Sequence, residues 1–116
     1  MVIGKSGWRF SYGDDGFVIA ENSQMEIGVC RAISDYFDDM RDFETVSWVR
    51  PEWDAIKRHY PEDPTGIAFN ATVATLIGED SVEIRSYHDQ FDTIRISEAD
   101  FSRALGDFET FLRGQG

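Results

Sequence analysis

Residues 66–96, GIAFNATVATLIGEDSVEIRSYHDQFDTIRI, decide the fold. Hydrophobic side chains alternate with smaller or more polar ones over 66–77, 81–87 and 91–96, and the turn-forming stretches 78–80 and 88–90 separate these segments. A period of two is typical of strands that bury one face, and short polar turns join neighbouring antiparallel strands. The stretch therefore predicts a three-stranded antiparallel meander.

Weaker signals on either side of the meander predict the other elements. Residues 8–12 and 17–20 flank the turn cluster Gly13-Asp14-Asp15-Gly16, which is typical of a β-hairpin. The capping box Ser23-Gln24-Met25-Glu26 predicts a helix over 24–42. The β-branched stretch 45–49 favours a short strand, and Pro51 favours the start of a second helix over 51–60. A last helix follows Ser97-Glu98-Ala99-Asp100 and ends near Gly114.

This order of elements predicts an α+β fold. We expect an antiparallel sheet, made of the N-terminal hairpin plus the three-stranded meander, with about three helices packed mainly on one face. The 116 residues form one domain, 1–116, and 41% of them are hydrophobic. A chain of this length buries enough surface to fold without metal or disulfide cross-links.

The charge balance narrows the classes of partner. The chain carries 22 acidic and 11 basic residues, for a formal net charge of −11. Such a chain repels nucleic acid and anionic membranes, so we expect neither as a direct partner. The single cysteine, Cys30, forms no internal disulfide, and Met1–Tyr12 lacks the order of a secretion signal. With no apolar run long enough to span a bilayer, these features predict a cytoplasmic protein.

The sequence contains no motif that predicts catalysis. There is no phosphate-binding loop, dinucleotide fingerprint, nucleophile triad or zinc-ligand spacing, so we expect no enzyme, cofactor or metal site. His59 and His88 lie far apart in the sequence, and each is more typical of a surface histidine. If folding brings them together, a small enzyme or ligand-binding domain with a pocket near them, beside Tyr60 and Tyr87, is the alternative.

One pattern does point to function. Asp35, Asp38, Asp39 and Asp42 have the spacing i, i+3, i+4 and i+7, which places four carboxylates in one stripe along the predicted first helix. Like charges at this spacing destabilise a helix, and anions near its C-terminal end interact unfavourably with its dipole. Residues that break local rules without a local gain often mark functional surfaces.

The stripe has three interpretations. It is a solvated face that keeps the protein dispersed, a docking surface for a basic protein, or a divalent-metal site, since 38–42 matches Asp-Asp-x-x-Asp. The chain is too short and too rich in strands for the helical enzymes that use that motif, so we favour docking. Glu44, Glu52 and Asp54 extend the acidic field. Trp48 and Trp53 lie between them in the sequence, as interface anchors or as core residues.

The chain resembles the bacterial immunity proteins of contact-dependent growth inhibition and other polymorphic toxin systems. The resemblance lies in the small acidic α+β profile, in the segment Asp35-Tyr36-Phe37-Asp38-Asp39, in the hairpin over 82–96, and in the closing stretches 96–101 and 108–112. It implies a complex with one cognate toxin domain, commonly a nuclease with a basic cleft. A protein-interaction subunit that does not inhibit its partner is the remaining alternative.

Overall fold

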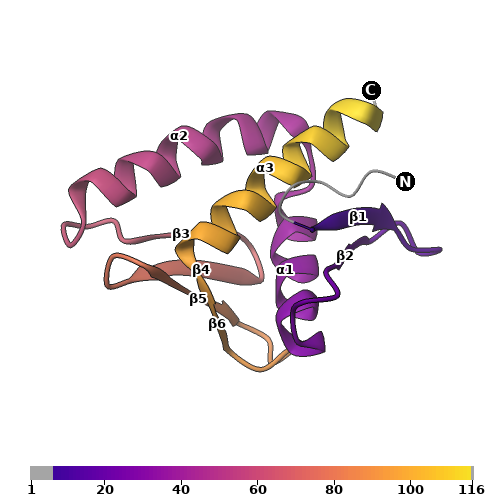
Figure 1. Ribbon diagram of the computed structural model, residues 1–116, viewed down its shortest axis with the longest axis horizontal. Helices are drawn as coiled ribbons and strands as arrows, with labels where there is room; N and C mark the ends of the chain where they lie inside the picture. Colours follow the sequence, from indigo (N-terminus) through magenta and orange to yellow (C-terminus); the bar gives the residue numbers. More distant parts are fainter. Residues whose placement is uncertain (1–6, 116) are drawn as a thin grey trace.

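A computed structural model of the chain describes residues 7–115 (Figure 1). Residues 1–6 and 116 lie outside the described residues. They belong to the predicted domain, 1–116, and residues 1–6 also belong to the segment Met1–Tyr12, which lacks the order of a secretion signal. The elements, in chain order, are β1 (Arg9–Tyr12), β2 (Val18–Glu21), α1 (Ile27–Met40), α2 (Phe43–His59), β3 (Gly66–Ala68), β4 (Thr72–Ile77), β5 (Ser81–Ser86), β6 (Ile94–Ser97) and α3 (Glu98–Gln115). The predicted α+β class, with an N-terminal hairpin, a meander and three helices, is confirmed.

The meander has four strands, in the order β3-β4-β5-β6, and all neighbours are antiparallel. The long strand predicted over 66–77 is divided, because the chain turns back at 69–71 and the Phe69 N–H donates to the Thr72 carbonyl at 2.8 Å. Gly66 permits the close pairing of β3 with β4, since a Cβ there would lie 2.5 Å from the Ala74 carbonyl oxygen. The division matters because Ala71 of the 69–71 turn lines an acidic groove along α1.

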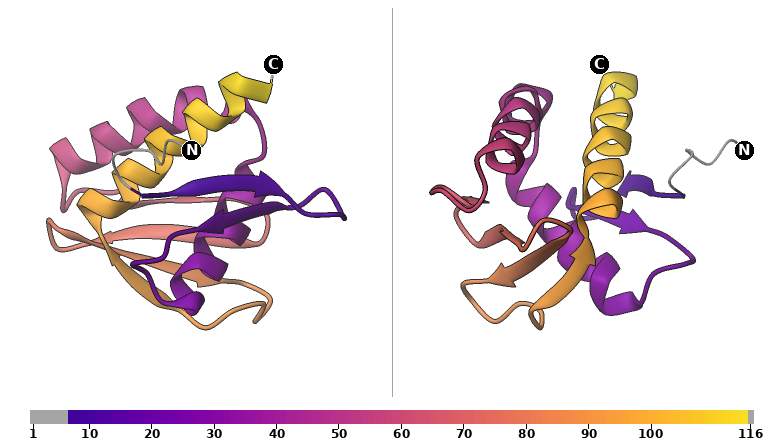
Figure 2. Two further views of the ribbon diagram at one scale, coloured as in Figure 1. Left: turned by 45° about the vertical axis from the view of Figure 1, so that its right-hand side comes forward. Right: turned by 60° about the vertical axis from the view of Figure 1, so that its left-hand side comes forward.

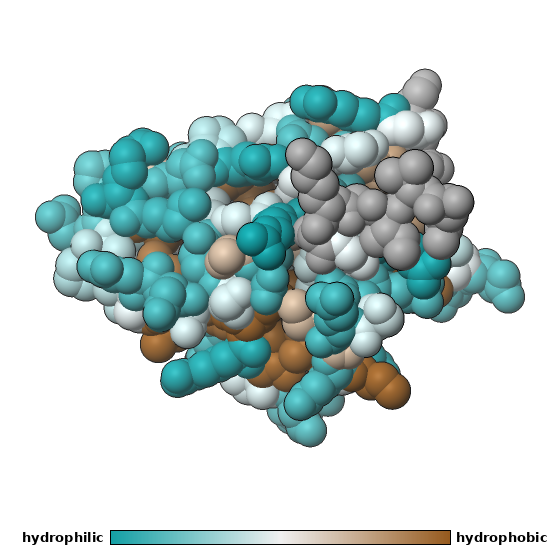
Figure 3. All heavy atoms as spheres, in the orientation of Figure 1, coloured by the Kyte–Doolittle hydropathy of each residue, from teal (hydrophilic) through white to brown (hydrophobic). Residues whose placement is uncertain are grey.

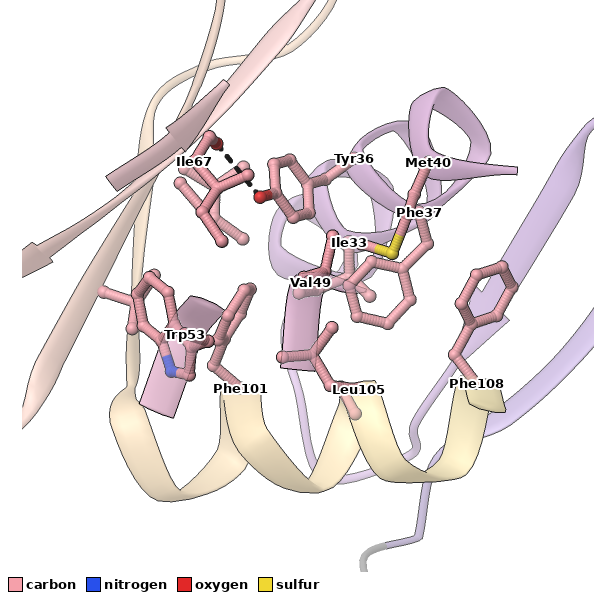
Figure 4. Close-up of a cluster of buried hydrophobic side chains, with 14 of the residues drawn as sticks. Ile33, Tyr36, Phe37, Met40, Val49, Trp53, Ile67, Phe101, Leu105 and Phe108 are labelled. Atoms are coloured by element: carbon pink, nitrogen blue, oxygen red, sulfur yellow. Dashed lines mark hydrogen bonds between the residues drawn. The ribbon is translucent and has the colours of Figure 1, made fainter. Parts of the chain in front are cut away.

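All three helices lie on the same side of the meander (Figures 1 and 2). The sheet buries alternate side chains against them, and the pairs Leu76 with Val82 and Ala74 with Ile84 share that face. Phe37 of α1 packs against the rings of α3, with its centroid 4.9 Å from that of Phe108 (Figure 4). The core residues are Ile33, Tyr36, Phe37, Met40, Val46, Val49, Trp53, Ile56, Leu76, Val82, Ile84, Phe101, Leu105 and Phe108.

The N-terminal hairpin forms a separate two-stranded sheet beside α1 and α3 (Figure 1). Phe10 packs its ring on Phe37 and Phe108, at centroid distances of 5.5 and 5.1 Å. This aromatic contact joins the hairpin to the core and fixes where its other strand, β2, meets α1.

Two predictions about the helices are wrong in detail. The capping box is not used: α1 starts at Ile27, and Glu26 at its N-cap makes no side-chain cap bond. The stretch 45–49 is not a strand, and Pro51 does not start a helix, since α2 runs unbroken from Phe43 to His59. A strong cap decides this, because Asp42 accepts from the Thr45 N–H at 2.8 Å and starts α2 well before the proline.

Candidate binding groove

An open acidic groove runs along α1, between β2 and the 69–71 turn. It has a volume of about 560 Å³ and is lined by Asp35, Asp38 and Asp39 of α1 together with Asp15 of the hairpin turn. Among the described residues, Arg31 is the one basic residue that lines it. Four carboxylates therefore share a concave surface with the Arg31 guanidinium, and Arg41, outside the lining, lies 3.9 Å from Asp38. The excess of carboxylates gives the groove a negative potential.

Asp38 holds the hairpin side of this groove. Its Oδ1 accepts from the Val18 N–H at 3.0 Å, and one turn earlier the Ser34 hydroxyl accepts from the Ala20 N–H at 2.8 Å. These two N–H groups belong to the edge of β2 that, within residues 7–115, has no strand beside it. Side chains of α1 thus replace a missing strand, which protects the edge from pairing with another chain.

Asp39 holds the other wall. Its Oδ2 accepts from the Ala71 N–H and from the Thr72 hydroxyl, both at 2.9 Å. These bonds tie α1 to the turn between β3 and β4. The unfavourable charge pattern on α1 is therefore offset in part by tertiary hydrogen bonds that the sequence pattern does not reveal.

Asp35 and Asp38 each meet an arginine at 3.9 Å, Asp35 with Arg31 and Asp38 with Arg41, but Asp35 accepts none of the backbone hydrogen bonds that hold Asp38 and Asp39. Burial in the groove raises the pKa of the Asp35 carboxyl; the Arg31 guanidinium opposes this shift, and the charge of Asp38 adds to it. A further cation close to Asp35 would therefore favour its ionised form.

Asp42 does not belong to the stripe. Arg41 adopts φ = 69° and ends α1, so that Asp42 becomes the N-cap of the next helix. Hydrogen bonds from the backbone and hydroxyl of Thr45 lower the pKa of Asp42. The Asp-Asp-x-x-Asp match is thus split between two helices, and no three His, Cys, Asp or Glu residues within 7–115 are arranged to hold a metal ion.

The remaining predicted partner residues lie on α2, outside the groove lining. Glu44, Trp48 and Glu52 are exposed, and Asp54 is exposed beside Lys57, with 3.5 Å between Oδ1 and Nζ. Trp53 is 1% exposed, and its Nε1 donates to Glu98 Oε2 at 2.9 Å. Because its ring fills the core, we remove Trp53 from the candidate surface.

The two histidines are not brought together. His59 ends α2 and lines a pocket of about 160 Å³ that His88 does not line. The neighbouring Tyr60 hydroxyl accepts from the Gly78 N–H, before the start of β5, whereas His88 follows the other end of that strand. The structure therefore gives no support to a pocket shared by the two rings, which the enzyme alternative requires.

Sequence reasoning missed the hairpin side of the groove. Phe17 and Ile19 line it and are 51% and 41% exposed. One signal was present: residues 17–20 read FVIA, so both faces of this strand are apolar although the hairpin can bury only one. The exposed pair gives the acidic groove an apolar rim.

Comparison of the chain with family models, with curated proteins and with solved structures yields no match. Within the part of the chain that the structure describes, no helix is both long enough and apolar enough to cross a membrane.

Proposed function

We propose that this protein is an immunity protein, which binds a cognate basic toxin domain through the groove along α1 and thereby neutralises it. The observation that carries the proposal is the concave surface on which Asp15, Asp35, Asp38 and Asp39 gather beside the exposed Phe17 and Ile19. The resemblance to immunity proteins supplies the class of partner, commonly a nuclease. Such a function places the protein in the cytoplasm, where it would meet an incoming toxin.

The physical chemistry of the two partners supports this assignment. A nuclease attracts phosphate groups, so its cleft is positive, and carboxylates held on a rigid helix compete for that cleft. Complementary charge accelerates encounter, toward about 10⁸–10⁹ M⁻¹s⁻¹ at low salt. Lasting affinity comes from apolar contacts near the centre of an interface, a role for which Phe17 and Ile19 are placed.

Asp35 is the residue on which binding should depend most. Asp38 and Asp39 already accept backbone hydrogen bonds, whereas Asp35 is partly buried beside another carboxylate, with Arg31 at 3.9 Å. A lysine or arginine entering the groove would supply a closer cation. Its arrival would lower the raised pKa of Asp35, so complex formation should release protons when the pH is near that value.

The test uses a candidate basic nuclease toxin domain and the variant Asp15→Asn/Asp35→Asn. We expect the association rate at low salt to fall about tenfold and its salt dependence to flatten, measured by stopped-flow mixing. The matched control is Glu62→Gln/Asp63→Asn, which removes two exposed charges outside the groove lining and should change the rate less than about twofold.

Two other outcomes would contradict the proposed function. Equal rates and salt slopes for the groove variant and the control would remove the groove from the mechanism. Binding that leaves the activity of the toxin domain unchanged would overturn inhibition and support an interaction subunit that does not inhibit its partner.

A further inference from the structure

We propose that the exposed face of α2 around Trp48 is a second contact site, which binds an arginine side chain of the protein partner. Trp48 and its neighbours lie outside the groove lining. The inference rests on the proposed function only in taking the arginine to come from the same basic partner.

Three residues on successive turns of α2 form this site. Glu44, Trp48 and Glu52 follow each other at intervals of four, so their side chains share one face of the helix. All three are exposed, and Trp48 is 47% exposed while the other two tryptophans, Trp8 and Trp53, are buried. Hydrophilic residues dominate the visible side of α2 (Figure 3).

The indole is held in place from one side. Its ring meets the ring of Phe69 edge-on, with 6.3 Å between centroids. This contact restrains the Trp48 side chain while about half of it stays open to solvent. A restrained aromatic ring loses little conformational entropy on binding, which is a common property of interface anchors.

Pro51 adds an acceptor beside the ring. It lies inside α2 and has no N–H, so the Ser47 carbonyl has no donor at the position four residues later. Ser47 and Pro51 are both exposed. An incoming group with several N–H donors would therefore find an indole face, two carboxylates and a backbone carbonyl within two turns of one helix.

Two other exposed aromatic rings, those of Phe43 and Tyr87, already have a cation, whereas the exposed rings of Tyr12 and Phe17 have none recorded in the described part of the chain. The Arg113 guanidinium lies 5.5 Å from the centre of the Phe43 ring, and that of Arg85 lies 5.9 Å from the centre of Tyr87. Within residues 7–115 the structure records no cation over Trp48 and no ion pair for Glu44 or Glu52. The ring best suited to a cation–π contact is thus left open between two uncompensated carboxylates.

This chemistry selects arginine over lysine. The planar guanidinium stacks on an aromatic face and directs five donors sideways, whereas an ammonium is compact and strongly hydrated. One partner can occupy both sites, because the 69–71 turn links them: Phe69 contacts Trp48, and Ala71 lines the groove.

The experiment uses two peptide probes of equal length, hexaarginine and hexalysine, added to ¹⁵N-labelled protein at physiological salt. Binding is followed by NMR at the Trp48 indole N–H, assigned by its loss in Trp48→Phe. We expect hexaarginine to bind about two- to fivefold more tightly than hexalysine, which is the range of a cation–π contact at an exposed site. Both peptides share the general attraction to an acidic protein, so the ratio of their affinities isolates the site.

Variants test each part of the site. For variants without the indole, affinities are read from the backbone amides of 44–52. The ratio of the hexaarginine affinity to the hexalysine affinity should shrink in Trp48→Phe and reach one in Trp48→Leu. It should also fall in Pro51→Ala, which restores a helix hydrogen bond to Ser47 and should stabilise the fold, so that a lower ratio cannot be assigned to unfolding. Glu44→Gln/Glu52→Gln should weaken both peptides, with Glu79→Gln/Asp92→Asn, at two exposed carboxylates away from α2, as the matched control.

Equal affinities of hexaarginine and hexalysine for the unaltered protein, or a preference that survives in Trp48→Leu, would overturn the inference. Asp15→Asn/Asp35→Asn should leave the ratio unchanged. A failure of the toxin domain to bind, together with an intact Trp48-dependent ratio, would reject the proposed function and keep the arginine site.

Discussion

Single carboxylates of this protein have different tasks although the sequence groups them as one stripe. Asp38 and Asp39 accept hydrogen bonds from opposite walls of the groove, and Asp42 caps a helix. Asp35 is left with an arginine at 3.9 Å. The same residue type in one pattern thus divides into acceptors of tertiary or capping hydrogen bonds and one carboxylate, Asp35, for which an ion pair is recorded instead.

The structural task of Asp39 predicts a loss of stability. Asp39→Ala removes the acceptor of the Ala71 N–H and the Thr72 hydroxyl, so the free energy of unfolding should fall by about 1–3 kcal/mol. Urea titration at pH 7 measures it. Asp92→Ala, at an exposed aspartate, should change it by less than about 0.5 kcal/mol. Equal losses in the two variants would show that the bonds of Asp39 do not stabilise the fold.

For Asp35, unlike Asp39, we expect that removing the charge does not lower the stability of the fold. Its pKa is raised chiefly by burial, so the folded state holds its proton more tightly than the unfolded state, and ionisation destabilises the fold as the pH rises through that raised value. Asp35→Asn should therefore leave stability at pH 7 unchanged or raise it by less than about 1 kcal/mol, because the site is part-exposed. Thermal unfolding at pH 7 checks this. A clear loss of stability would mean that the carboxylate is structural.

At the scale of elements, the boundary between α1 and α2 controls the placement of the acidic residues. The positive φ of Arg41 stops α1, and the next residue starts a helix that continues through Pro51. The cap and the hydrophobic face of α2, with Val46, Val49 and Trp53 buried, outweigh the local cost of the proline. The exposed residues of α2 therefore form one continuous face.

The cap predicts a pH-dependent contribution to stability. Asp42→Ala should lower the free energy of unfolding by about 1 kcal/mol at pH 7. The pKa of Asp42 is lower in the folded state, so its ionic contribution is complete above the ordinary carboxyl pKa and is lost as the pH falls through the depressed value. Urea titrations at pH 7 and pH 3 should show the difference between the two proteins shrinking; a constant difference would contradict the ionic part of the cap.

At the scale of the whole molecule, negative charge exceeds positive charge twofold. The net charge of −11 is spread over 116 residues. Several carboxylates are paired locally, as Glu109 is with Arg50 at 3.1 Å, but the groove lining keeps an excess of carboxylates. The excess negative charges repel one another within the fold, and the same charges would attract a basic partner.

Global repulsion predicts stabilisation by salt. Raising the NaCl concentration tenfold, from about 50 to about 500 mM, shortens the Debye length to below about 5 Å, so the melting temperature should rise by a few degrees. Differential scanning calorimetry measures the shift. The shift should be smaller in Glu62→Gln/Asp63→Asn/Glu79→Gln, which carries three fewer exposed charges. A melting temperature that falls with salt would indicate that favourable ion pairs dominate instead.

The sequence by itself determined the α+β class, the two turns of the 66–96 meander and the apolar faces of the helices, because periodicity and turn residues act between near neighbours in the chain. Only the tertiary structure decided that the strand breaks at 69–71, that Asp42 leaves the stripe, and that Trp53 is core while Trp48 stays open. Those outcomes depend on partners distant in sequence, such as Val18 for Asp38 and Ala71 for Asp39. Local patterns do not encode such pairings, since the packing of the hairpin and the meander on opposite sides of α1 sets which donors each carboxylate meets.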